Sequence, residues 1–346
     1  MILKPKLFYD PSSTESVSDR KIFGGKPTSI FELNKIKYPA FYSLWKVMMH
    51  NTWFPEEVNM NPDKKIYERI LSENEKICYN RALAQLIFMD SLQTHQLTDN
   101  LNPYVTAPEL NLCLVRQAFE ESLHSQSYAV MVDGISDQSD EIYQLWRSDL
   151  HLKTKNDQIA KAYETFRDEP TPENFVFSCC ANQVLEGVYF YCGFAYFYAL
   201  AKNDKMLASS KMIRFIHRDE LTHTALFAKI VQTLRKESDT SKLFQSKELL
   251  DRIGKLLESA YDVESSWGAY ITQNSLLGFT NESIKNYVKY LVNQRAKALR
   301  VDLPFEDVKN PFKWIDEFAS FNETRANFFE SSVNNYSKGS LEWDDF

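Results

Sequence analysis

The pattern Glu-x-x-His occurs twice in this chain, and each copy follows a stretch that carries one acid in an apolar run. Glu121 and His124 form the first copy, and Glu220 and His223 form the second. Residues three apart on an α-helix share one face, so each pair can bind one metal ion together. The doubled pattern constrains the fold strongly, because its side chains must converge from several helices.

A single acid precedes each copy at a matched distance. Asp90 lies in "LAQLIFMDSLQ", 31 residues before Glu121, and Glu186 lies in "NQVLEGVYFYCGF", 34 residues before Glu220. A spacing of about 30 residues between helix centres suits long antiparallel neighbours in a bundle. A carboxylate in an apolar helix is costly unless it is paired or binds a metal. No Lys or Arg lies within one turn of either acid.

These acids and histidines predict a dimetal site. Two single acids and two Glu-x-x-His pairs are the ligand set of ferritin-like di-iron and di-manganese bundles. Four carboxylates also neutralise two divalent cations, and oxygen ligands with two imidazoles favour Fe or Mn over structural zinc. The pattern leaves open two Fe, two Mn or a mixed pair. The predicted ligands are Asp90, Glu121, His124, Glu186, Glu220 and His223.

The rest of the chain favours an all-α fold. Only 9 glycines and 12 prolines occur in 346 residues, which favours long helices over a turn-rich β fold. We expect a ferritin-like helical bundle with additional flanking helices and a flexible C-terminal tail. Helical patterns cover 72–101, 107–135, 138–166, 175–203 and 205–237, and further helices extend to about residue 302.

We predict three parts along the chain. Residues 1–30 are polar and broken by proline and glycine, which is typical of an arm. Residues 31–325 form the dimetal helical domain. Residues 326–346 mix Ser, Asn and Gly with the acidic, aromatic end "LEWDDF", which is typical of a mobile tail.

Composition narrows the partners and the compartment. A net charge of −7 argues against nucleic acid as a direct partner. No run of 18 apolar residues predicts a membrane span, and the N-terminus lacks a signal-peptide pattern. Five cysteines without a Cys-x-x-Cys motif fit reduced, buried thiols in a cytoplasmic protein.

Aromatic residues beside the ligands suggest redox chemistry. Tyr128 lies four residues beyond His124, so its phenol shares the face of the metal ligands. A core tyrosine is the plain alternative in a chain with 18 tyrosines. Phe190 and Phe194 follow Glu186 by four and eight residues and would line the site, although core packing alone predicts the same stripe.

The chain resembles the radical-bearing small (β) subunit of class I ribonucleotide reductase over most of its length. The matching stretches are "TWFPEEV", "FMDSLQ", "AFEESLHSQSY", "LEG…F…F", "RDELTH" and "NNYSKGSLEWDDF". The resemblance implies that O₂ or a reduced-oxygen species oxidises the metal pair, which generates a tyrosyl radical. A catalytic large subunit would then use this radical to reduce ribonucleotides to deoxyribonucleotides. The resemblance also implies a homodimer.

The resemblance assigns a role to each residue. One metal, nearer the tyrosine, would be held by Asp90, Glu121 and His124, and the other by Glu186, Glu220 and His223, with Glu121 and Glu220 bridging.

The remaining roles concern electron and proton transfer. Tyr128 would carry the radical, Trp53 and Asp219 would link His124 to the surface, and Tyr336 would relay the oxidation into the large subunit. The tail would dock that subunit. The sequence leaves open whether a flavodoxin-like activator is needed.

Two other functions remain open at this point. A ferritin-like dimetal oxidase would act on its own small substrate and would have no use for the tail. Iron storage, or a purely structural bundle with solvated acids, would need no radical residue.

Overall fold

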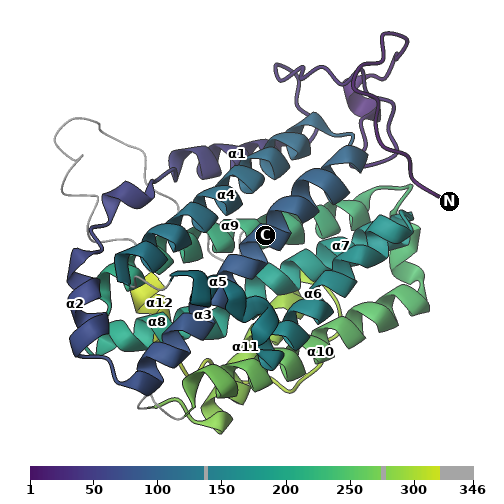
Figure 1. Ribbon diagram of the computed structural model, residues 1–346. Helices are drawn as coiled ribbons and strands as arrows, with labels where there is room; N and C mark the ends of the chain where they lie inside the picture. Colours follow the sequence, from purple (N-terminus) through teal and green to yellow (C-terminus); the bar gives the residue numbers. More distant parts are fainter. Residues whose placement is uncertain (136–138, 274–277, 320–346) are drawn as a thin grey trace.

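The computed structural model describes residues 1–135, 139–273 and 278–319, and within these ranges the fold is built from α-helices (Figure 1). The only β pairing among them is an isolated bridge between Phe23 and Val105. The all-α prediction is confirmed. The helices are α1 (Pro39–His50), α2 (Asn61–Arg69), α3 (Glu73–His95), α4 (Pro108–Ile135), α5 (Ser139–Ser148), α6 (Leu150–Asp168), α7 (Pro172–Val184), α8 (Tyr191–Lys202), α9 (Leu207–Lys236), α10 (Lys247–Thr272), α11 (Asn281–Leu299) and α12 (Lys313–Ala319).

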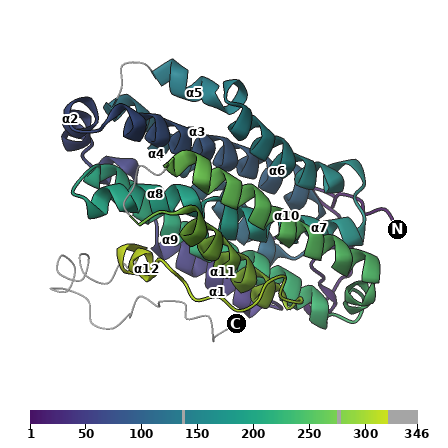
Figure 2. The same cartoon turned by 90° about the horizontal axis from the view of Figure 1, so that it is seen from below.

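Two helical hairpins form the centre of the molecule. The first consists of α3 and α4, and the second of the α7–α8 run and α9. These long helices lie along a common direction in Figure 1. The other helices flank them: α1 packs against α4 (Figure 1), and α6 packs against α7. α10 packs against α7, α8 and α11, as Figure 2 shows from below.

Local sequence explains where the central helices begin. Ser72 caps α3, because its Oγ accepts the Glu75 N–H at 3.3 Å and the Glu75 carboxylate accepts the Ser72 N–H at 2.8 Å. Pro108 opens α4, where its missing N–H costs nothing. Gly134 lies in the last turn of α4, where an added Cβ would be 2.8 Å from the Met60 Cβ. This glycine therefore permits close packing.

The helix expected over 175–203 is interrupted. A π-helical turn, Leu185–Tyr189, separates α7 from α8, and a second one, Gln96–Leu101, follows α3. A π turn places one extra residue in the helix, and such turns occur frequently at functional sites. The first π turn contains Glu186. An apolar periodicity of 3.6 residues gives no sign of it.

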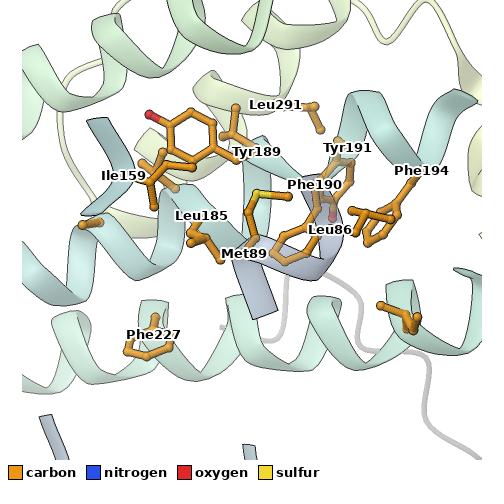
Figure 3. Packing of buried hydrophobic residues seen from close by; sticks show 14 of the residues in the cluster. Leu86, Met89, Ile159, Leu185, Tyr189, Phe190, Tyr191, Phe194, Phe227 and Leu291 are labelled. Carbon is orange, nitrogen blue, oxygen red and sulfur yellow. The ribbon is translucent and has the colours of Figure 1, made fainter. Parts of the chain in front are cut away.

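The segment Pro172–Lys202 is long and apolar enough to cross a membrane, but its apolar stretch is completely buried inside the fold. The segment thus belongs to the core. Figure 3 shows Leu185 and Phe190 packed with Met89 and other apolar side chains. The rings of Phe190 and Phe194 stack with centroids 5.5 Å apart.

Residues 1–30 contain one short 3₁₀ turn, Val17–Asp19, and one residue of the isolated β bridge, Phe23. They are anchored to two inter-helix connections: the Leu3 N–H donates to the Pro170 carbonyl at 2.7 Å, and the Lys6 N–H donates to the Pro103 carbonyl at 2.8 Å. The proposed division into arm, domain and tail stays a prediction, and residues 326–346 lie outside the described ranges. All five cysteines are buried and free, as expected.

Candidate metal centre

The six predicted ligands converge in the centre of the bundle, and all six side chains are fully buried. They come from both hairpins, so neither hairpin can build the site alone. Asp90 lies on α3, Glu121 and His124 on α4, Glu186 in the π turn, and Glu220 and His223 on α9.

Their ligand atoms form two overlapping groups, in each of which the atoms lie within 4.8 Å of one another. Glu121 and Glu220 belong to both groups. The first group adds Asp90 and His124, and the second adds Glu186 and His223. This is an arrangement in which two carboxylates can bridge two cations.

The first histidine ring points its Nδ1 into the cluster. His124 Nδ1 is 3.2 Å from Glu220 Oε1, 3.5 Å from Glu121 Oε2 and 3.7 Å from Asp90 Oδ2.

The His223 ring also points its Nδ1 into the cluster, from the other side. His223 Nδ1 is 3.0 Å from Glu220 Oε2, 3.3 Å from Glu121 Oε1 and 3.8 Å from Glu186 Oε2. The two rings are 6.0 Å apart between centroids.

Many of these buried polar atoms make no hydrogen bond, although such atoms are normally paired in folded proteins. Burial and the neighbouring carboxylates raise the pKa of Asp90, Glu121 and Glu220. Burial opposes charge on the two histidines, yet the surrounding acids raise their pKa values. The donor set therefore fits two cations. The unpaired atoms are both Asp90 oxygens, Glu121 Oε2, Glu186 Oε2, Glu220 Oε1 and His124 Nδ1.

Hydrogen bonds fix one oxygen of Glu186 and leave the other facing the cluster. Glu186 Oε1 accepts from Gln93 Nε2 at 2.5 Å and from Gln117 Nε2 at 2.7 Å. The Tyr163 hydroxyl in turn donates to Gln93 Oε1 at 2.8 Å. Sequence analysis missed both glutamines. The only available signal was their position. Gln117 lies one turn before Glu121, and Gln93 lies three residues after Asp90.

A second pair of acids orients the two histidines. His124 Nε2 lies 3.3 Å from Asp219 Oδ2, and His223 Nε2 lies 2.9 Å from Glu120 Oε2. Each acid directly precedes the glutamate of one Glu-x-x-His copy and contacts the histidine of the other copy. Carboxylates in this position fix the tautomer and orientation of ligand histidines. Sequence analysis left Glu120 without a role, although the repeated acid before the motif was a usable signal.

Two arginines connect these outer acids to the loop that holds Trp53. Arg116 Nη2 is 3.0 Å from Glu120 Oε1, and Arg218 Nη2 is 3.2 Å from Asp219 Oδ1. Each arginine also donates to an oxygen of residues 51–52. The metal centre and this loop are therefore joined by two parallel chains of hydrogen bonds.

Trp53 is buried and reaches the site through Asp219. Its Nε1 donates to Asp219 Oδ2 at 2.6 Å, and the same oxygen faces His124. The Trp53 ring lies 6.2 Å from the His124 ring and stacks on Phe215 at 4.9 Å. The predicted set Trp53, Asp219 and His124 is thus contiguous.

Tyr128 is fully buried one turn beyond His124, and its hydroxyl lies beside the Asp90 carboxylate. Burial and the charge of Asp90 raise the pKa of Tyr128 well above its usual value, so the phenol is neutral. Tyr336 lies outside the residues that the structure describes.

The contact between Glu120 and His223 leads to a prediction. Replacing Glu120 with leucine should weaken binding of one metal ion about 10- to 100-fold, because the His223 ring loses the acceptor that orients it. A titration with Mn²⁺ against a competing chelator measures the loss. Glu120→Gln keeps an oxygen acceptor and should lose less. Wild-type affinity in the leucine variant would refute this role.

Comparisons with known proteins identify similar sequences. The family model of the ribonucleotide reductase small chain matches residues 30–311. The ribonucleoside-diphosphate reductase subunit beta of Treponema pallidum is 36% identical over 351 residues, covering 99% of this chain and 98% of that protein.

Solved structures are similar as well. The ribonucleotide reductase R2 subunit from Clostridium botulinum matches with a TM-score of 0.88 and 34% identity, covering 93% of this chain and 100% of that chain. The dimanganese(II)-NrdF of Streptococcus sanguinis shares the fold, with a TM-score of 0.72 and 21% identity, covering 84% of this chain and 98% of that chain. The predicted ferritin-like fold is thereby confirmed.

Proposed function

This chain belongs to the ribonucleotide reductase small-chain family as a β subunit of ribonucleoside-diphosphate reductase, and from this premise we propose that it generates a radical on Tyr128. The observation that carries the proposal is the pair of overlapping buried ligand groups with Tyr128 one turn away. Family membership argues against iron storage and against an oxidase with its own substrate.

Each ligand group would hold one metal ion, with Glu121 and Glu220 shared between them. Asp90 and His124 would complete the site nearer Tyr128. Fe or Mn suits the donor set, and the name of one structural neighbour specifies two manganese ions. Bound there, the metals would supply the oxidising equivalent drawn from O₂ or a reduced-oxygen species.

The residues around Tyr128 prepare it for oxidation. Tyr128 would lose one electron and its phenolic proton, and the Asp90 carboxylate is the acid beside its hydroxyl. Asp90 is therefore the proposed proton acceptor. Full burial among apolar side chains keeps water and reductants away from the resulting radical.

Transfer of the oxidation to a large subunit needs a route out of the bundle. We assign Trp53 and Asp219 to this route, because Asp219 contacts both Trp53 and His124. Tyr336 in the tail would take the oxidation across the subunit interface. The large subunit would then reduce the ribonucleotide.

Deleting residues 331–346 tests the role of the tail. Reductase activity with a large subunit should fall to background, because the docking segment and Tyr336 are lost. The metal content and the tyrosyl signal should persist, because the ligands lie within the helical domain. Assays of reductase activity and paramagnetic resonance on the same sample separate the two effects. Unchanged reductase activity would rule out docking through the tail.

We also propose that the chain forms a homodimer through the outer face of α1 and α4. Apolar side chains are exposed there, with Met49 46%, Val115 56% and Phe119 42% accessible. Phe119→Glu should convert the dimer to a monomer in sedimentation experiments, because burying a charge at an apolar interface is costly. A dimer that survives this change would place the interface elsewhere.

The buried, free cysteines support a reducing, cytoplasmic location.

A further inference from the structure

A buried ion pair lies at the end of the π turn that carries Glu186. Lys155 Nζ of α6 is 2.6 Å from Glu264 Oε2 of α10, and the two side chains are 2% and 0% exposed. Neither residue belongs to the metal centre. The pair therefore needs a separate explanation.

Both members of the pair also bond to the backbone where the helix is interrupted. Lys155 Nζ donates to the Tyr189 carbonyl at 2.9 Å, the last carbonyl of the π turn. Glu264 Oε1 accepts the Cys192 N–H at 3.1 Å, in the first turn of α8. The ion pair thus spans the junction between the π turn and α8.

These contacts match what helix ends require. The last carbonyls and first N–H groups of a helix lack partners within it, and in a buried position they must find others. A cation suits the carbonyl end and an anion suits the N–H end. Lys155 supplies the cation and Glu264 supplies the anion, and each charge neutralises the other.

A second contact holds the same turn from another side. An added Cβ at Gly187, the residue after Glu186, would lie 2.3 Å from the Arg295 Cδ. Arg295 of α11 therefore packs directly on the backbone of the π turn. The turn is fixed at its middle by α11 and at its end by α6 and α10.

Stability alone does not account for the ion pair. Burying two charges is costly, and replacing a buried pair with apolar side chains of similar size is often neutral or stabilising. An apolar pair, however, could not bond the Tyr189 carbonyl or the Cys192 N–H. The backbone contacts are therefore what distinguishes Lys155 and Glu264 from two packed apolar side chains.

We propose that Lys155 and Glu264 are positioning residues that hold the π turn so that Glu186 faces the second metal ion. This inference rests on the proposed function, in which Glu186 is a ligand. Without the pair, the junction would relax toward regular α-helix, in which each carbonyl and N–H finds a partner. Because a π turn contains one extra residue, such a change would rotate Glu186 away from the cluster.

The double substitution Lys155→Met/Glu264→Met tests the proposal, because methionine replaces both side chains at similar length without charge. The variant should stay folded by thermal denaturation. Its affinity for Mn²⁺ should fall at least tenfold at the site that contains Glu186 and His223, called the His223 site. The site that contains Asp90 and His124, called the His124 site, should retain its metal. Anomalous diffraction at the Mn edge identifies which site is depleted. The single substitution Lys155→Arg keeps a cationic donor and leaves Glu264 intact. This variant should keep much of the wild-type affinity for Mn²⁺.

A matched control is the pair Arg20 and Glu109, joined at 3.3 Å with side chains 8% and 0% exposed. Glu109 likewise accepts a backbone N–H, that of Lys37 at 2.7 Å, just before α1. Arg20→Met/Glu109→Met should leave both metal sites at wild-type affinity. An equal loss of metal in both double variants would show a general effect of stability and would overturn the proposal.

The outcomes separate this proposal from the proposed function. If the wild-type protein binds two metals and the Lys155/Glu264 variant binds both with the same affinity, the positioning role is wrong. If the wild-type protein binds fewer than two, the metal centre itself is wrong. Should the double variant not fold, Lys155→Met is measured instead, because it removes the donor to the Tyr189 carbonyl while Glu264 still accepts the Cys192 N–H. It should weaken metal binding at the site that contains Glu186 and His223, and wild-type affinity there would overturn the proposal.

Discussion

Replacing Tyr128 with phenylalanine is expected to remove the tyrosyl signal completely and to reduce reductase activity to background. The substitution deletes only the phenolic oxygen, which is the group that must lose a proton when the radical forms. Because the substitution removes one oxygen and leaves the buried ring in place, the variant should stay folded. Paramagnetic resonance of oxidised, metal-loaded protein measures the signal.

The control for this experiment is Tyr79→Phe. Tyr79 is also fully buried on α3, but its hydroxyl bonds Ser209 and lies away from the metal ligands. This variant should keep both the tyrosyl signal and two metal ions. A signal that survives in Tyr128→Phe would assign the radical to another residue.

Replacing Glu220 with alanine should reduce the metal content from two ions per chain to one or none. Glu220 belongs to both ligand groups, so its loss removes a donor from each metal. It also leaves three carboxylates to neutralise two divalent cations. Elemental analysis of purified protein measures the change, and the tyrosyl signal should disappear with the metal.

Glu237→Ala is a suitable comparison, because Glu237 directly follows α9, the helix that carries Glu220. It contacts Tyr38 and not the cluster. Two metals should remain bound in this variant. If Glu220→Ala also retained two tightly bound metals, the proposed ligand set would be incorrect.

The cluster of the six proposed ligands could be predicted from sequence because each signal is local. Glu-x-x-His fixes one face of a helix, and an acid such as Asp90 in an apolar run has no local counter-ion. The matched spacing then requires two antiparallel hairpins. The all-α fold follows from the same helical periodicity and from the scarcity of glycine.

Other parts of the site depend on contacts between residues that are distant in the sequence. Local sequence patterns do not predict these contacts. The π turn at Glu186 is supported by Lys155 and Glu264, which are 109 residues apart. The crossed contacts of Glu120 and Asp219 appear only when α4 and α9 pack together. The amide donors to Glu186 come from two other helices. The sequence therefore predicted which side chains converge in the bundle, and packing determines how they are held.

The most direct test of the central claim is anomalous diffraction, combined with elemental analysis, on protein matured with both Fe and Mn. The account predicts two metal ions per chain. One should lie among Asp90, Glu121, His124 and Glu220, and the other among Glu121, Glu186, Glu220 and His223. A chain that binds fewer than two metals, or binds them at other residues, would contradict it.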